Sequence, residues 1–162
     1  MQDTKAFWLS VNGFFAVSIM GTLFHFLYEI SGGCALAGMF APINETPFEH
    51  LKLLFFPFAL WGILEYFVYG RRTKGFFFSK ALGVTVGMIF ILCAFYLYSS
   101  ILNRTILTVD ILIFVVSVVI AFALSLPFMF LIRFKSELYD ELGVGVLVLE
   151  ALMFWLVTII SF

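Results

Sequence analysis

The sequence predicts an all-α integral membrane protein, a bundle of five transmembrane helices. Of its 162 residues, 64% are hydrophobic and 12% are charged, whereas soluble domains are about 45–50% apolar and about 25% charged. Five stretches are long and apolar enough to cross a hydrocarbon core of about 30 Å, which takes about 20 helical residues. The polar segments between them are too short to fold alone. We therefore expect one transmembrane domain, residues 1–162, whose partner is the lipid bilayer.

The same composition excludes other classes of protein. Disordered chains combine low hydrophobicity with high net charge, and this chain has neither. Nine Lys and Arg residues against ten Asp and Glu residues give a net charge of −1, so the basic field of a nucleic-acid-binding protein is absent. Two cysteines are too few for a disulfide framework or a zinc ribbon.

The expected spans follow one another with short connections. The first, residues 6–30, begins with a longer uncharged run than the roughly 7–15 residues of a signal-peptide core, so we expect it to stay attached. The second, 47–70, begins at a proline and holds several ionisable residues. Long runs without an ionisable side chain define the third and fourth spans, 76–102 and 107–132, and the fifth is 139–162.

Three features of these spans predict how the helices pack. Gly83 and Gly87 form a GxxxG pair in the third span, a pattern that lets a neighbouring backbone approach closely. Pro57 and Pro127 each remove one helical hydrogen bond and predict kinks in the second and fourth spans.

The distribution of Lys and Arg predicts the orientation, because cytoplasmic loops carry an excess of both. With the N-terminus in the cytoplasm, only Lys52 and Arg104 lie on the other side. We therefore expect a cytoplasmic N-terminus and an extracytoplasmic C-terminus. The basic residues on or near the cytoplasmic face are then Lys5, Arg71, Arg72, Lys74, Lys80, Arg133 and Lys135.

Ionisable groups inside a membrane are costly, about 2.5–3.5 kcal/mol for Asp, Lys or Arg at the helix centre, so each requires a reason. His25 lies about 7 Å, and His50 about 5 Å, below the outer ends of consecutive antiparallel spans. Glu29 shares a helix face with His25. This placement predicts a zinc-like divalent metal site with His25, Glu29 and His50 as ligands. Bis-histidine haem ligation is the poorer alternative.

Other polar residues crowd the same level. Asn44, Glu45 and Lys52 are candidate ligand-binding residues of this extracytoplasmic pocket. Glu49 is a candidate catalytic base, but Thr46-Pro47-Phe48-Glu49 also reads as a capping box in which Glu49 would bond back to the Thr46 amide. For Lys52 we expect an ion pair with Glu29 or Glu49, or extension to the interface.

Two further acids lie deeper in the membrane. Glu65 is expected to pair with Lys80, which enters the third span at a similar depth. Glu150, about 12 Å from the cytoplasmic boundary, has no cation in its own helix. It is a candidate catalytic or proton-transfer residue, or a neutral acid that forms a structural hydrogen bond.

The stretch Asn44-Glu45-Thr46-Pro47-Phe48-Glu49-His50-Leu51-Lys52 resembles a family of small bacterial polytopic membrane proteins with an N-E-[ST]-x-[WF]-E-H-x-K motif at the start of the second span. Thr46 replaces a serine and Phe48 a tryptophan of the family pattern. The resemblance covers most of the chain. It implies that Asn44, Glu45, Glu49, His50 and Lys52 act as a unit, and that the protein is a multi-pass protein of a cell membrane, the bacterial inner membrane. It implies no particular activity.

Three functions remain open. The pocket predicts a ligand- or metal-binding protein, including a metal-assisted hydrolase or transferase that acts within the membrane. Membrane-buried acids at different depths are also typical of a proton- or cation-coupled transporter. Five spans without an inverted repeat would then need a homodimer or a membrane partner subunit. The third function is that of a structural or accessory subunit of a membrane complex.

Overall fold

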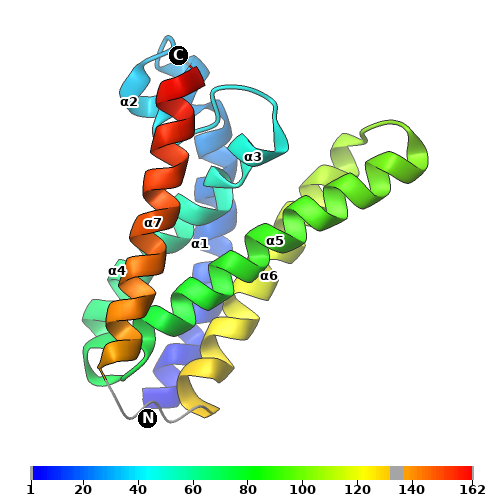
Figure 1. Ribbon diagram of the computed structural model, residues 1–162. Coiled ribbons are helices and arrows are strands. Elements are labelled where there is room, and N and C mark those ends of the chain that lie inside the picture. The colour runs from blue at the N-terminus through cyan, green and yellow to red at the C-terminus, as the bar shows by residue number, and fades with distance from the viewer. Residues whose placement is uncertain (1, 132–136, 162) are drawn as a thin grey trace.

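The computed structural model describes residues 2–131 and 137–161, and all the secondary structure in those ranges is helical (Figure 1). The helices are α1 (Gln2–Ile30), α2 (Ala35–Gly38), α3 (Pro47–His50), α4 (Lys52–Val68), the 3-10 helix η1 (Gly70–Arg72), α5 (Phe76–Leu102), α6 (Leu107–Leu131) and α7 (Leu138–Ser161).

Five of these segments have the length and hydropathy of a membrane span, counted over the described residues. α3 and α4 follow each other almost without interruption and together form the second span. The spans are Thr4–Ile30, Pro47–Val68, Phe76–Leu102, Leu107–Met129 and Leu138–Ser161. The prediction of an all-α fold with five helices long and apolar enough to span a membrane is therefore confirmed for the described residues.

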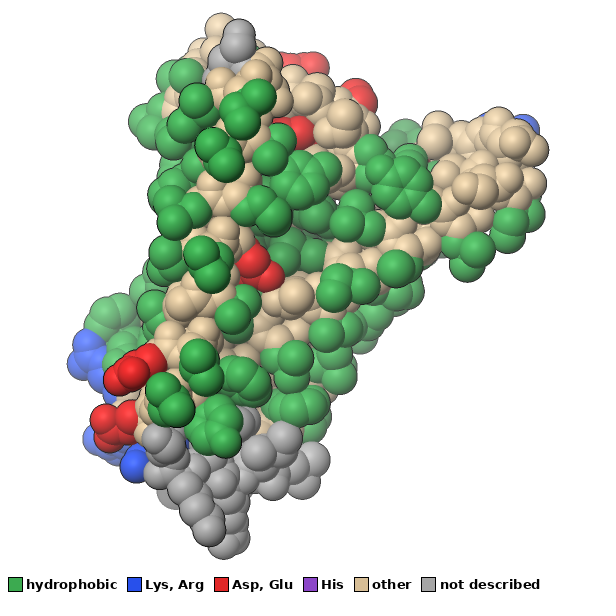
Figure 2. Space-filling view, viewed as in Figure 1, with side chains coloured by type: hydrophobic (Ala, Val, Ile, Leu, Met, Phe, Trp, Pro, Cys, Tyr) green, Lys and Arg blue, Asp and Glu red, His purple; other side chains and the backbone are tan. Residues whose placement is uncertain are grey.

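The outer surface is apolar, as a lipid environment requires. Large side chains such as Leu23, Leu97 and Ile160 are 63%, 66% and 75% exposed. Hydrophobic side chains cover most of the visible flank of the molecule, and, apart from an acidic side chain midway along it, the charged side chains lie toward the ends (Figure 2). In water such a surface would drive aggregation, whereas lipid chains solvate it.

α4 lies at the centre of the bundle and packs against α1 and α5. Its side chains Phe55 and Phe58 are almost fully buried and form one core with Val84 of α5, Val118 of α6 and Phe154 of α7. α5 and α6 lie along each other and lean away from α1, α4 and α7 at the end where they are joined (Figure 1).

Glycines set the close contact between α5 and α6. A side-chain carbon at Gly83 would collide with the backbone carbonyl of Ala121, and one at Gly87 would lie 3.0 Å from the backbone oxygen of Ser117. The GxxxG pair therefore serves helix packing, as expected.

Polar contacts close both ends of α5. At its start, the Asp140 carboxylate of α7 accepts hydrogen bonds from the amides of Gly75 (2.7 Å) and Phe77 (2.9 Å). At its end, Tyr98 donates to Asp110 of α6, and Asn103 adopts the left-handed conformation, with φ of 50°, that ends many helices.

The expected pair of Glu65 and Lys80 is confirmed. Both side chains are buried and in direct contact. The Lys80 ammonium also lies over the Phe58 and Phe122 rings, 5.1 and 5.0 Å from their centroids. Tyr69, just beyond the second span, lies against this pair. Burial and the neighbouring Glu65 raise the pKa of its phenol far above the ordinary value, so Tyr69 stays neutral.

We expect Gly83→Ala to destabilise the protein, because the added methyl would push α5 away from the Ala121 carbonyl; overpacking typically costs about 1–3 kcal/mol. Gly145→Ala on α7 is the matched control, since nothing lies within 4 Å of the added carbon. Thermal unfolding in one detergent should show a lower midpoint for Gly83→Ala alone. Equal midpoints would show that α5 and α6 do not need this contact.

Candidate functional site

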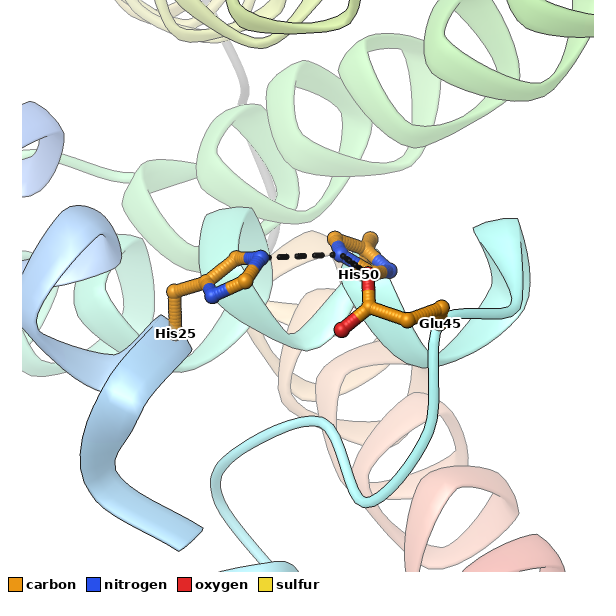
Figure 3. Close-up of side chains that lie close together, drawn as sticks. All are labelled: His25, Glu45 and His50. Atoms are coloured by element: carbon orange, nitrogen blue, oxygen red, sulfur yellow. Dashed lines mark hydrogen bonds and ion pairs between the residues drawn. The ribbon is translucent and has the colours of Figure 1, made fainter. Parts of the chain in front are cut away.

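The two histidines of the chain meet at one end of the bundle. His25 lies on the last turns of α1 and His50 at the end of α3. Their Nε2 atoms are 3.2 Å apart (Figure 3). Helices α1 and α3 thus bring together residues that are 25 positions apart in the sequence.

The backbone fixes the protonation of His50. Its Nδ1 lies 2.9 Å from the Thr46 carbonyl oxygen. A carbonyl oxygen only accepts hydrogen bonds, so Nδ1 carries the proton and donates. In neutral His50 the lone pair is then on Nε2, which faces His25. In a metal-binding histidine, the ring nitrogen that does not bind the metal commonly donates to a backbone carbonyl in this way.

Glu45 completes the group. Its Oε2 lies 3.4 Å from Nε2 of His50, and one ligand atom from each of His25, Glu45 and His50 falls within 4.8 Å of the others. The Glu45 side chain is 83% exposed and that of His50 is 26% exposed. The cluster therefore lies at the surface, open to ions and small ligands.

These spacings suit a tetrahedral metal ion. Two imidazole nitrogens bound to zinc at about 2.0–2.1 Å lie roughly 3.3–3.4 Å apart at the tetrahedral angle. The observed Nε2–Nε2 distance is 3.2 Å. The two rings therefore already stand at about the separation that a shared ion would require.

The loop before α3 is organised by Asn44. Its Oδ1 accepts hydrogen bonds from the amide (3.0 Å) and the hydroxyl (2.6 Å) of Thr46. The predicted capping box is therefore wrong: Asn44, not Glu49, satisfies the Thr46 amide. Asn44 thus holds the turn that carries Glu45 and the Thr46 carbonyl.

Glu49 instead forms an ion pair with a buried cation, Lys52. It is 1% exposed, and its Oε2 accepts from the amide of Ile43 (3.1 Å) and the ammonium of Lys52 (2.6 Å). Lys52 is 0% exposed and also donates to the Thr158 hydroxyl (2.6 Å) and the Gly38 carbonyl (3.0 Å). This ion pair, the second of the two that we expected for Lys52, connects α3, α4, α7 and the loop after α2.

The polar residues expected in one pocket thus form two groups. The histidine cluster (His25, Glu45 and His50) is accessible, whereas the Lys52 network (Glu49, Lys52 and Thr158) is buried. Glu29 belongs to neither group and is exposed. Glu45 was expected to bind ligand, not metal. The sequence feature that could have identified Glu45 as a member of the cluster is its position one residue before Thr46, whose carbonyl oxygen accepts a hydrogen bond from His50.

Glu150 lies on the face of α7 that meets α5. Its Oε1 is 2.6 Å from the hydroxyl of Thr85, which also lies 2.8 Å from the carbonyl oxygen of Ala81. The other carboxyl oxygen, Oε2, is shielded and has no hydrogen-bond partner in the described part of the chain. Thr85 had given no signal in the sequence, because a threonine in an apolar helix has many roles.

We expect Lys52→Met to destabilise the protein strongly, by about 3–5 kcal/mol, because it leaves the Glu49 charge buried and unpaired. The double variant Lys52→Met/Glu49→Gln should recover part of that loss. The control is Lys74→Met, which removes an exposed cation. Unfolding midpoints in detergent measure all three. A Lys52→Met protein as stable as the Lys74→Met protein would show that the buried pair contributes nothing.

Comparison with known proteins adds a family but no activity. The searches of curated proteins and of solved structures gave no match. The family of unknown function DUF6512 matches residues 1–161, almost the full length of the chain. The protein therefore belongs to this family, DUF6512.

Proposed function

We propose that the protein is a multi-pass membrane protein that binds a zinc-like divalent cation through His25, Glu45 and His50. The observation that carries the proposal is that ligand atoms of two imidazoles and one carboxylate lie within 4.8 Å of one another, with the two Nε2 atoms 3.2 Å apart. This ligand set replaces the Glu29 of the sequence-based set with Glu45.

The proton positions support this proposal. When both histidines are neutral, the Nε2 lone pair of His50 points toward His25 Nε2 and the Glu45 carboxylate. Together, the two Nε2 atoms and the Glu45 carboxylate have more lone pairs than protons. Such a group is stabilised by a positive charge at its centre, which is either one extra proton or a metal ion. Imidazole with carboxylate is a donor set typical of zinc.

Three protein ligands leave one position of a tetrahedral ion open. A water molecule bound there would be acidified and could act as a nucleophile. The cluster lies at the end of membrane-spanning helices, where an amphiphilic substrate can reach it. Metal-assisted hydrolysis or transfer on such a substrate is the activity that this arrangement supports.

We expect the full-length protein, purified without chelators, to hold one zinc or similar ion per chain. His25→Ala and His50→Ala should abolish retention, and Glu45→Gln should weaken it. The loss of metal affinity for each histidine should exceed the roughly 10–100-fold that follows when a hydrogen-bond partner of a ligand is removed. Elemental analysis and zinc titration measure occupancy and affinity. Acidic buffer should weaken binding, because imidazole binds metal in its neutral form.

Glu29→Gln is the matched control, because Glu29 is an acid on α1, one turn from His25, outside the cluster. It should retain the ion. Loss of metal in Glu29→Gln with retention in Glu45→Gln would favour the ligand set expected from sequence. A metal-free protein that fails to bind added zinc would leave a proton as the central charge and end the proposal.

A second candidate function, proton exchange within the membrane, is favoured by the contact between Glu150 and Thr85. The hydroxyl of Thr85 has one proton and two short oxygen contacts. If it donates to the Ala81 carbonyl, Glu150 must carry the proton of the second bond. A carboxyl group that gains and loses this proton would be an intermediate proton-binding site on a path through the membrane.

We expect an infrared band of a protonated carboxyl group that disappears in Glu150→Gln and shifts in Thr85→Val, since Thr85→Val removes the partner but not the acid. Glu65→Gln, which alters a different acid inside the bundle, is the control and should leave this band unchanged. The band should vanish at high pH if the carboxyl exchanges protons with the medium. A band that Glu150→Gln leaves unchanged would remove Glu150 from any proton path.

A further inference from the structure

A polar cavity lies at the end of the molecule opposite the histidine cluster. Its volume is about 390 Å³, and its walls are the end of α4, the turn through η1 and the first turn of α7. We propose that this cavity binds the zwitterionic headgroup of a phospholipid, of the phosphoethanolamine type. The residues that carry the charges are Arg71, Arg72 and Lys74 on one wall and Glu137 and Glu141 on the other.

The cavity lies at the depth of lipid headgroups. It is placed between the end of the second span at Val68 and the starts of the third and fifth spans at Phe76 and Leu138. Side chains of Lys or Arg and of Asp or Glu lie next to each other at this end of the visible face (Figure 2). The hydrocarbon region therefore begins at the cavity, and a lipid whose headgroup occupied it would have its chains on the apolar flank.

The basic wall is free to bind an anion. Within the described residues the ion pairs are those of His50, Lys52 and Lys80, so Arg71, Arg72 and Lys74 have no carboxylate partner there. The guanidinium of Arg71 lies 4.3 Å from the centroid of the Phe67 ring, which holds it at the edge of the cavity. Guanidinium and ammonium groups are the usual partners of a phosphate.

The acidic wall selects the second charge of the ligand. Glu137 directly precedes α7 and lies one turn before Glu141, whose amide donates to the Glu137 carbonyl, so the two side chains lie on the same side of the start of the helix. Asp140 also lines the cavity, but its carboxylate is taken by the amides of Gly75 and Phe77. Two available carboxylates opposite three cations favour a ligand that has both a phosphate and an amine. A primary ammonium donates three hydrogen bonds, whereas a choline group donates none.

Native mass spectrometry of the full-length protein in detergent tests this proposal with three lipids of identical acyl chains. They are phosphatidylethanolamine, phosphatidylcholine and phosphatidylglycerol. We expect phosphatidylethanolamine to bind roughly tenfold or more tightly than the other two, the effect of one charge-assisted hydrogen bond. The basic-wall variant Arg71→Gln/Arg72→Gln/Lys74→Gln should weaken binding of all three lipids.

The acidic-wall variant Glu137→Gln/Glu141→Gln should remove the preference for phosphatidylethanolamine but leave phosphatidylglycerol binding intact. Arg104→Gln, an exposed cation at the opposite end, is the control and should change nothing. Three results would overturn the proposal. They are equal binding of the three lipids, a phosphatidylglycerol preference in the unaltered protein, and competition by inorganic phosphate or soluble glycerophosphoethanolamine as strong as that by the lipid.

Discussion

The free-energy cost of burying the Lys52 charge is the constraint that organises the end of the bundle where the histidine cluster lies. A lysine at 0% exposure within a membrane-spanning segment is tolerated only if its ammonium is paired and fully hydrogen-bonded. Glu49 neutralises the charge, and the Thr158 hydroxyl and Gly38 carbonyl take the remaining protons. Because these oxygens come from separate elements, the hydrogen bonds of one cation draw α2, α3 and α7 together.

That arrangement positions the histidine cluster. Glu49 also accepts a hydrogen bond from the Ile43 amide, so the loop segment that leads to Asn44 and Glu45 is bound to the Lys52 network. His50 lies next to Glu49 on α3, facing the other way toward α1. The buried network thus supplies rigidity, while the exposed cluster beside it keeps its lone pairs available. A loop residue such as Glu45 is a reliable partner only when its backbone is held in this way.

The sequence predicted the fold well because the bilayer restricts what a chain can do. Backbone groups must be satisfied within each span, so length and hydropathy were sufficient to find five helices and to place both ends of α5. The pairs Glu65–Lys80 and Glu49–Lys52 could be anticipated for the same reason, since a buried charge needs an opposite charge within reach. The convergence of His25 and His50 followed from helix depth alone.

The remaining site details depend on side-chain choices that depth does not determine. Glu49 had two partners within reach, the Thr46 amide and Lys52. A charge-assisted bond to a buried ammonium is stronger than a bond to an amide that Asn44 can also satisfy. Glu29 and Glu45 were likewise both candidates, since Glu29 is four residues after His25 and Glu45 is five residues before His50. The choice between them depends on the path of the loop through residues 38–46, which is set by contacts with Lys52 and not by any periodic pattern.

Charged side chains are arranged differently in the core of the bundle and at its two ends, and this difference supports the two proposed binding sites. The Lys80–Glu65 and Lys52–Glu49 pairs are buried among aromatic rings and backbone oxygens, so each charge already has its partner inside the bundle. His25, Glu45 and His50 at one end, and the mixed walls around Arg71 and Glu141 at the other, keep unbalanced donors or acceptors at the surface. A membrane protein with so few charged residues has little reason to leave them unpaired unless a ligand completes them. Both proposed binding sites therefore lie at the ends of the bundle, and the core between them holds those ends in a fixed relation.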